Sequence, residues 1–359
     1  MSLTRLLVTV LTLTAVALCV TGCAPKPQPV TPTTNAPGPT TPTATTGGPM
    51  EEYVLIGIST GVEYWNATDQ GGKDATAELG VEWTFAGPPD QNPERQANDM
   101  DSIIARKPAG ILIAPGDPKM LIPYINKAMD QGIPVICIDT DAPESKRIAY
   151  FGTENYNAGV IGAKTLAELI GGKGKVCIST RPGQWNLDER LRGYRKTFEK
   201  DYPGITIVQV IDDETKYAVG QQRAGAVLNQ HPDLAGFAGC NAASGPGVAR
   251  AVKDAGKVGK VKVVAMDADK AILDLIDEGV IQASVAQRQY RMAYIGVRYL
   301  YGLNHGKYRA PGDTTKPDLP EIPKVIDTGT KVVTKDNVAQ FRTPSQGCKE
   351  EMKPEELAI

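Results

Sequence analysis

Histidine is almost absent from this chain, which has only His231 and His305 among its 359 residues. Neither histidine lies beside a plausible nucleophile, and the sequence contains no G-x-S-x-G element, no P-loop and no cluster of metal-ligand residues. These absences argue against the common hydrolase, nucleotide-hydrolysing and metalloenzyme classes. We therefore expect no enzymatic activity, no catalytic residue, no metal site and no cofactor.

An excess of charge of one sign is also missing. Lys and Arg total 39 and Asp and Glu total 41, so the formal net charge is −2. A nucleic-acid-binding surface normally carries a basic excess, so we expect no nucleic acid partner. Apolar residues make up 41% of the chain, which is enough for buried cores, and the length suits two domains.

Long apolar runs are missing except at the N-terminus, where Arg5 is followed by an apolar run over residues 6–20. That run is too short for an ordinary spanning helix and is typical of a signal peptide. It ends in the letters VTGC, the pattern of a bacterial lipobox. We interpret residues 1–22 as a lipoprotein signal peptide and Cys23 as the lipidated first residue of the mature chain. The alternative is an ordinary signal peptide followed by an incidental cysteine.

Charge and large apolar side chains are scarce over residues 23–50, which are rich in Pro and Thr. Such a segment cannot bury enough apolar surface to offset its conformational entropy, so we expect a disordered linker. A Pro-rich linker extends by about 3.1 Å per residue. The linker would therefore hold the folded body at a distance on the order of tens of ångströms from the membrane. Residues 346–359 form a charged C-terminal tail.

Closely spaced cysteine pairs of the C-x-x-C kind are lacking as well, which argues against a metal or redox motif. Cys19 is removed with the signal peptide, and Cys348 belongs to the polar tail. Cys137, Cys177 and Cys240 lie in apolar, strand-like runs. We interpret these three as buried, unpaired thiols rather than as disulfide partners.

What the sequence does contain, from Glu51 onward, is a regular alternation of short apolar runs and helical stretches. The runs are apolar at nearly every position, as in parallel strands covered by helices on both faces. The alternation predicts an α/β fold with doubly wound parallel sheets, and two sets of five strands indicate a duplicated lobe. The predicted strands are Tyr53–Ser59, Val81–Ala86, Ala109–Ala114, Ile133–Asp139, Ile148–Gly152, Lys175–Thr180, Ile205–Ile211, Ala235–Asn241, Val261–Asp267 and Val280–Ala286.

Two of these strands end alike, in the segments IPVICIDTDA and KVVAMDADK. Each is a buried strand that ends in Asp-x-Asp. Ligands of open α/β sheets bind beyond the carboxyl ends of strands, so we expect Asp139 and Asp267 to point into a cleft between the lobes. For Asp141 and Asp269, ligand contact and capping of the next helix are both open.

The residue types at these strand ends suit a polyol. Carboxylates and Arg supply charge-assisted hydrogen bonds to hydroxyls, and aromatic rings cover the apolar face of a sugar. Either Tyr64 or Trp65 is expected to contact the ligand, while the other could belong to the core. The remaining candidates from this pattern are Ser59, Trp185, Arg190, Asn241 and Gln287.

From about Tyr53 to Phe341 the chain resembles the type I periplasmic sugar-binding proteins of ABC importers, the ribose-, galactose- and autoinducer-2-binding group. The resemblance rests on the order of several short motifs, each weak by itself. They are IST at 58–60 with YW at 64–65 and Gly71; IPVI at 133–136 before Asp139; GTEN at 152–155 before Gly159; GGKGKV at 171–176; ERLRGY at 189–194; Asn241 with Gly247; Val263–Asp267; and Gly279 to Gln287.

This resemblance implies two doubly wound parallel-sheet lobes joined by three hinge crossovers, near Thr153–Asn155, Gln287–Arg288 and Asp327–Gly329. The N-terminal lobe would hold residues 51–153 plus 288–327, and the C-terminal lobe residues 154–287 plus 328–345. The implied function is the extracytoplasmic substrate-binding component of an ABC importer. It would bind a monosaccharide or similar small polyol and pass it to the permease and its ATPase, as a monomer attached to the membrane only through its lipid anchor.

In ribose-binding relatives the sugar is held at the positions of Ser59, Trp65, Asp139, Arg190, Asn241, Asp267 and Gln287. This chain departs from that pattern in three places. It has Val62-Glu63 where an Asn is usual, Thr140 where an Arg follows the strand-end Asp, and no aromatic residue identified near Thr215. Trp185 is expected to supply the missing stacking face, and Thr140 to join the site. These departures argue against ribose as the ligand. They remain compatible with a polyol ligand.

Four alternatives to this function can be compared with the sequence. The protein could present its ligand to a chemoreceptor or histidine kinase, or bind a non-sugar such as autoinducer-2. An enzyme could use the Asp-x-Asp pairs as acid and base or to hold a metal, as in glycosyl transfer. A regulator of the lactose-repressor kind would share the lobes, but it would begin with a DNA-binding segment rather than an export signal.

Overall fold

The computed structural model describes residues 50–343. The predictions for the signal peptide, Cys23, most of the linker, Cys348 and the tail lie outside the described residues. Within residues 50–343, no helix combines the length and apolar character needed to cross a membrane.

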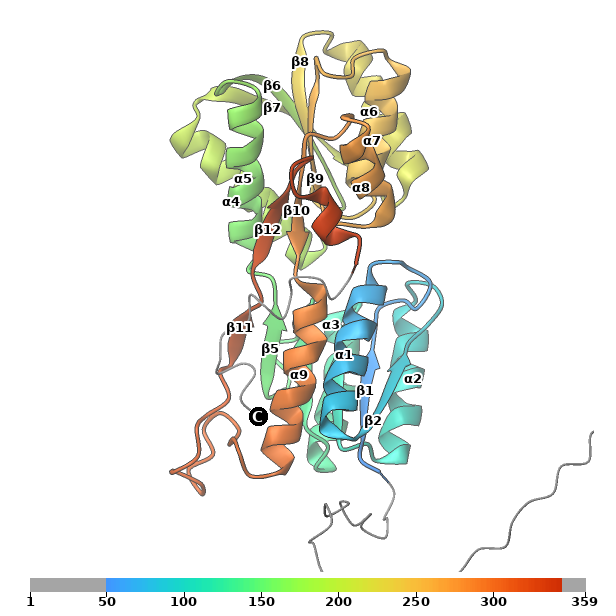
Figure 1. Cartoon of the computed structure of the whole chain (residues 1–359), viewed down its shortest axis with the longest axis vertical. Coiled ribbons are helices and arrows are strands. Elements are labelled where there is room, and N and C mark those ends of the chain that lie inside the picture. Colours follow the sequence, from blue (N-terminus) through green and yellow to red (C-terminus); the bar gives the residue numbers. More distant parts are fainter. Residues whose placement is uncertain (1–49, 344–359) are drawn as a thin grey trace, which may run out of the picture. The chain divides into compact units, whose positions relative to one another are not determined.

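Two six-stranded sheets organise the described chain (Figure 1). The first has the order β11-β5-β4-β3-β1-β2, and all its neighbouring strands are parallel. The second has the order β12-β10-β9-β8-β6-β7, and only β12 runs antiparallel to its neighbour. The strands of the first sheet are β1 Glu52–Ile56, β2 Glu82–Ala86, β3 Gly110–Ile113, β4 Val135–Ile138, β5 Ala149–Gly152 and β11 Val325–Asp327. Those of the second are β6 Lys173–Thr180, β7 Gly204–Asp212, β8 Leu234–Gly239, β9 Lys262–Met266, β10 Ala283–Gln287 and β12 Thr330–Val333.

Helices cover both faces of each sheet, which is why the strands are apolar at successive positions. In β1, Tyr53 and Leu55 face one core while Val54 and Ile56 face the other. The first core is closed by α1 and α9, and the second by α2 and α3. The helices of this lobe are α1 Trp65–Leu79, α2 Pro93–Arg106, α3 Pro118–Asp130 and α9 Gln289–Asn304.

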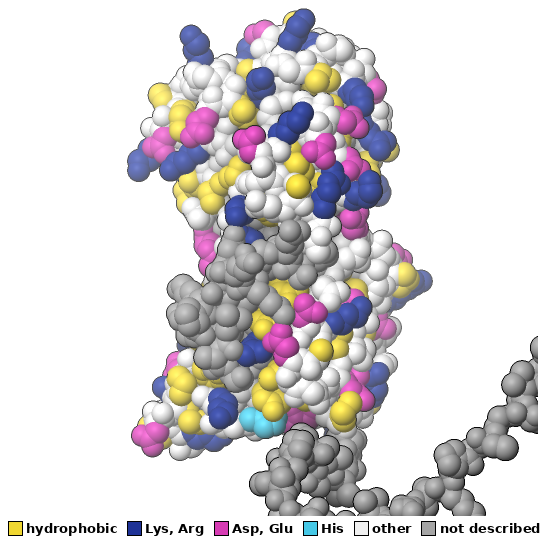
Figure 2. All heavy atoms as spheres, viewed as in Figure 1, with side chains coloured by type: hydrophobic (Ala, Val, Ile, Leu, Met, Phe, Trp, Pro, Cys, Tyr) yellow, Lys and Arg dark blue, Asp and Glu magenta, His cyan; other side chains and the backbone are white. Residues whose placement is uncertain are grey.

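The second lobe repeats this arrangement. Its sheet lies between α4 and α5 on one face and α6, α7 and α8 on the other. The bounds are α4 Asn155–Leu169, α5 Trp185–Asp201, α6 Tyr217–Gln230, α7 Ser244–Asp254, α8 Lys270–Asp277 and the short 3-10 helix η1 Val338–Phe341. On the face drawn in Figure 2, basic side chains are interspersed with acidic ones on both lobes.

The predicted fold class is confirmed. Each of the ten predicted strands overlaps an observed strand, and the chain passes between the sheets three times: after β5, after β10 and between β11 and β12. The lobe boundaries given in residue numbers stay predictions. Two strands, β11 and β12, were not among the predicted strands.

Hydrogen bonds join the three crossovers to one another. The Asp327 carboxylate accepts bonds from the backbone N–H groups of Glu154, at 3.0 Å, and Gly329, at 2.9 Å. The hydroxyl of Thr153, at the end of β5, donates to the side-chain oxygen of Gln287 at 2.8 Å. All three crossovers are therefore tied together at a few side chains.

The thiols of Cys137, Cys177 and Cys240 are buried and unpaired, as predicted. Burial raises the pKa of each of these thiols to about 12. They are consequently neutral and unreactive in the folded protein.

Two glycines from the resemblance motifs allow equivalent helix pairs to touch. A Cβ at Gly71 on α1 would lie 2.1 Å from the backbone oxygen of Tyr290 on α9. A Cβ at Gly159 on α4 would lie 2.1 Å from the backbone oxygen of Arg190 on α5. A side chain at either position would force the helices of its pair apart.

We predict that Gly71→Ala destabilises the protein by about 1–3 kcal/mol or more, since backbone atoms rather than a flexible side chain oppose the new methyl group. The matched control is Gly225→Ala in α6, where a Cβ would meet no atom within 4 Å. That control should stabilise by about 0.5–1 kcal/mol, because alanine favours a helix over glycine. Urea unfolding of both variants checks the prediction, and equal effects would contradict it.

Candidate functional site

The carboxyl ends of the strands of both lobes border one cavity of about 610 Å³. This is the region where open α/β sheets bind ligands. Seven of the ten predicted site residues line it: Tyr64, Trp65, Asp139, Arg190, Asn241, Asp267 and Gln287. We call this space the first cavity.

Asp139 and Asp267 occupy equivalent positions in the two lobes. Both adopt a left-handed backbone, with φ of 62° and 74°. The Asp139 N–H donates to the Phe151 oxygen of β5 at 3.2 Å, and the Asp267 N–H donates to the Val285 oxygen of β10 at 3.0 Å. A positive φ is unfavourable for residues other than glycine and concentrates at functional sites. The duplicated fold thus turns one carboxylate from each lobe toward the first cavity.

Burial dominates the electrostatics of these carboxylates. It raises the pKa of Asp139, although the Tyr64 hydroxyl, which donates to this carboxylate, and the Arg190 guanidinium act in the opposite direction. Burial likewise raises the pKa of Asp267 to about 6, against the effect of Arg190. The pKa of Asp269 rises to about 7 through burial and through the nearby charges of Asp267 and Glu63. The first cavity therefore concentrates acidic groups around one buried cation.

Arg190 is that cation, with only 3% of its surface exposed. Its Nε donates to the Asn155 side chain and its Nη1 to the Cys240 backbone oxygen, each at 2.9 Å. Its Nη2 is buried and has no hydrogen-bond partner among the described residues. An unpaired buried donor is costly, so this nitrogen is suited to a ligand oxygen.

Asn241 and Gln287 line the first cavity but use their side chains within the protein. The Asn241 amide donates to the Asp213 carboxylate at 3.0 Å, and its oxygen accepts from the backbone N–H groups of Ala243 and Ser244. Gln287 donates to the Asp267 carboxylate at 2.8 Å while accepting from Thr153. Gln287 therefore connects the hinge to a site carboxylate.

Three predicted site residues lie outside the first cavity. The Ser59 hydroxyl is buried and donates to the Pro89 backbone oxygen at 2.9 Å, which fixes the loop before α1. The Thr140 hydroxyl donates to the Pro115 backbone oxygen at 2.9 Å. Trp185 is 55% exposed and, with Thr140, lines an adjoining space. The hydroxyls of Ser59 and Thr140 therefore each bind a backbone oxygen of the protein.

The expectation that no aromatic residue lies near Thr215 is wrong. Tyr217, the first residue of α6, lines the first cavity and is 41% exposed. Asn186 and Asp269 also line this cavity. The sequence pattern did not indicate Asn186, and it left ligand contact and helix capping both open for Asp269. The position of Tyr217 just after a strand and at the start of a helix was a usable signal for it.

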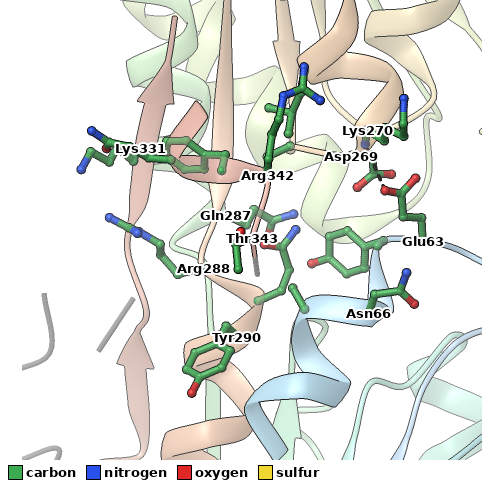
Figure 3. Close-up of a pocket in the computed structure, with 17 residues that line it drawn as sticks. Glu63, Asn66, Asp269, Lys270, Gln287, Arg288, Tyr290, Lys331, Arg342 and Thr343 are labelled. Atoms are coloured by element: carbon green, nitrogen blue, oxygen red, sulfur yellow. Dashed lines mark hydrogen bonds between the residues drawn. The ribbon is translucent and has the colours of Figure 1, made fainter. Parts of the chain in front are cut away.

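Glu63 enters the site from the loop before α1. Its carboxylate accepts a hydrogen bond of 3.1 Å from the backbone N–H of Lys270, at the start of α8 in the other lobe. Figure 3 shows Glu63 directed toward Asp269 and Lys270, beside a cavity of about 390 Å³ that also reaches the hinge residue Arg288. This contact joins the two lobes without a ligand.

Comparison with known proteins identifies the family. The model described as "Periplasmic binding protein domain" matches residues 53–307. The chain belongs to the periplasmic binding protein family. The family is extracytoplasmic, and the relatives named next are binding proteins rather than enzymes.

This periplasmic binding protein is similar to several sugar binders. The arabinose-binding protein AraP of Geobacillus stearothermophilus is 37% identical, with a TM-score of 0.76, over 82% of this chain and 100% of that one. A sugar-binding protein of a sugar ABC transporter from Bacillus halodurans is 36% identical, with a TM-score of 0.77, over 81% and 99% of the two chains. The D-ribose/D-allose-binding protein of Pseudomonas aeruginosa is 29% identical over 67% of this chain and 74% of its own length.

The fold, the inter-lobe cavity and these relatives agree on the function class. This periplasmic binding protein is the sugar-binding component of an ABC importer, with its site between two lobes.

We predict that Asp269→Asn stabilises the ligand-free protein increasingly as the pH rises. With a folded-state pKa of about 7 against an ordinary value of 3.8, wild-type Asp269 is ionised in the unfolded chain at intermediate pH and takes up a proton on folding. The stability of the wild type therefore falls as the pH rises through this range. The Asp269→Asn variant does not show this loss of stability, because asparagine does not titrate. The substitution also removes no helix cap, since the Asp269 side chain makes no capping hydrogen bond.

The gain should be small at about pH 4 and on the order of 3 kcal/mol at about pH 8. Urea unfolding at both pH values measures it. Asp336→Asn, at an exposed position, is the control and should show no such growth. An Asp269→Asn gain that is the same at both pH values would contradict the assignment of the effect to this buried carboxyl.

Proposed function

We propose that the protein captures a neutral aldose, a pentose or hexose, in the first cavity and delivers it to the ABC permease and its ATPase. One observation carries this proposal: Asp139 and Asp267 approach a common cavity from the two lobes, beside an Arg190 donor that has no partner among the described residues. The relatives are described as binders of arabinose, or of ribose and allose, which supports the same ligand class.

The charges favour a neutral ligand. Asp139, Asp267 and Asp269 line the first cavity together with one buried cation, Arg190. A phosphorylated or acidic sugar would meet unfavourable charge here. Sugar hydroxyls can instead donate to the carboxylates and accept from the guanidinium, both as charge-assisted hydrogen bonds.

The side chains divide into direct contacts and supports. We propose that Tyr64, Asp139, Arg190 and Asp267 bind hydroxyls and that Tyr217 covers the apolar face of the ring. Trp65 is 4% exposed and packs near Phe85, so it closes the floor of the first cavity. The supports Asn241 and Gln287 orient their neighbours, since their amides already have protein partners.

A ligand held from both lobes stabilises a closed arrangement through contacts that an open one lacks. A micromolar ligand supplies about −8 kcal/mol for closure and retention together. We propose residues 51–153 plus 288–327 and 154–287 plus 328–345 as the two moving bodies of a monomer. The closed form is the one that the permease would select.

We predict that Arg190→Lys weakens sugar binding at least about 100-fold. The single nitrogen of a lysine cannot occupy the separate positions from which Nε and Nη1 reach Asn155 and Cys240 and Nη2 is left for the ligand. A thermal-shift screen with D-ribose, D-allose, arabinose, xylose, glucose and galactose first finds the ligand. Calorimetry then compares the variants.

Arg195→Lys is the matched control, because Arg195 lies on the same helix but at an exposed position. It should bind the sugar as the wild type does. Undiminished affinity of the Arg190→Lys variant would refute the proposed site, and the absence of any sugar ligand would refute the proposed function.

We also propose that Cys23 is the lipid-bearing first residue of the mature protein and that residues 23–50 tether the sugar-binding body to the membrane. The VTGC sequence after an apolar run supports this. The tether would keep the monomer close to the permease.

We predict that Cys23→Ser releases the protein from the membrane fraction and abolishes incorporation of labelled palmitate. Only the thiol of the lipobox cysteine can be modified in this way, so Cys19→Ser, within the signal peptide, should leave both properties unchanged. Membrane fractionation of cells expressing each variant measures the effect. Retention of the Cys23→Ser protein on the membrane would contradict the anchor.

A further inference from the structure

A second cavity of about 610 Å³ lies beside the first and is lined by residues of both lobes. The two cavities share Ile58 and Gln91 from the first lobe and Gln184 and Asn186 from the second. Both volumes fall within the range of about 300–1,000 Å³ that is usual for small-molecule sites. Space for a ligand therefore continues past the residues that would hold one sugar ring.

Each of the two cavities contains one exposed aromatic ring. Trp185, 55% exposed, lines the second cavity, and Tyr217, 41% exposed, lines the first. All other aromatic side chains of residues 50–343 are buried or half-buried. A large ring in water gains by stacking on an apolar surface such as the C–H face of a sugar. Two such rings in adjoining cavities fit two sugar units.

The start of α5 forms the wall between the cavities. Trp185 faces the second, Arg190 faces the first, and Asn186 lines both. Asn186 and Arg190 are four residues apart and so share one helix face. The Asn186 side-chain oxygen is buried and has no hydrogen-bond partner among the described residues. This oxygen can accept a hydrogen bond where the two cavities meet. A ligand that spans both cavities would place a hydroxyl there.

Acidic groups in the second cavity already have protein partners. The Asp117 carboxylate caps α3 at the Met120 N–H, at 3.1 Å, and the Asp141 carboxylate is paired with Arg147. Arg181 lines this cavity and is exposed. The available groups can hydrogen-bond a neutral ligand and provide no unpaired buried charge that would demand an ionic one.

We propose that the second cavity is a second saccharide subsite with Trp185 as its stacking platform. The full ligand is then a neutral disaccharide or glycoside. Its first ring is the pentose or hexose unit of the proposed function, held against Arg190 and Asp267, and its second unit lies on Trp185. This inference rests on the proposed function, because it extends the same site. It also gives Trp185 a different task from the single-ring stacking expected from sequence.

Calorimetry with four matched pairs tests the subsite: xylobiose and xylose, cellobiose and glucose, melibiose and galactose, and arabinobiose and arabinose. At least one disaccharide should bind more tightly than its monosaccharide. Trp185→Ala should weaken that disaccharide about tenfold and the monosaccharide less than twofold. Tyr217→Ala should weaken both by similar factors, because its ring belongs to the shared first cavity. Since Trp185 is half exposed, thermal unfolding of Trp185→Ala should match the wild type.

The outcomes separate the two proposals. If a monosaccharide binds but none of the disaccharides does, the second cavity is only the mouth of the cleft and the subsite is refuted. If Trp185→Ala weakens both members of a pair equally, Trp185 belongs to a single-ring site and the subsite is again refuted. If none of the eight sugars binds but D-ribose or D-allose does, the subsite is refuted and the proposed function stands. If D-ribose and D-allose also fail to bind, both the subsite and the proposed function fail.

Discussion

The rest of the site depends on one electrostatic constraint: two carboxylates from opposite lobes are withdrawn from water around a single buried guanidinium. Asp139 and Asp267 are each exposed by only a few per cent, and Arg190 offsets part of the burial cost of both. A buried charge is tolerable only where it is paired and hydrogen-bonded. Without a ligand one donor of the Arg190 guanidinium has no partner among the described residues, and burial raises the pKa of both carboxyl groups. A hydroxyl-rich guest satisfies both kinds of group at once.

The fold could be predicted from the sequence because its strands are buried on both faces. That burial gives continuous apolar runs, and alternate residues of a run such as 53–56 serve two different cores. β11 and β12 lack this property, since Val325–Asp327 and Thr330–Val333 are short and mostly not buried. They pair at the sheet edges because the crossovers carry the chain there. No local sequence pattern indicates such edge pairing. The sequence also does not indicate that β12 runs antiparallel to its neighbour.

The lining of the first cavity could be predicted where a residue lies within two positions of a strand end, as Asp139, Asn241 and Asp267 do. Parallel strands deliver their carboxyl ends to one edge, so strand prediction was enough. Residues on helices and loops were harder. Whether Trp185 faces the first or the second cavity depends on the rotation of α5 about its axis, which apolar periodicity does not fix at an exposed first turn. Ser59 lies outside the first cavity for another reason, because its hydroxyl donates to the backbone oxygen of Pro89, a contact that no local sequence pattern indicates.

The contact between Gly159 and the backbone of Arg190 has a consequence for how specificity can change. A helix pressed against its neighbour without an intervening Cβ cannot slide or rotate without a clash, so the guanidinium stays where helix packing puts it. Descendants of this protein that acquire new sugars would therefore conserve the Arg190 anchor and diversify the first turn of α5 instead. A laboratory library aimed at new ligands would be most productive at positions 184–186, where side chains line the cavities and are free of that packing.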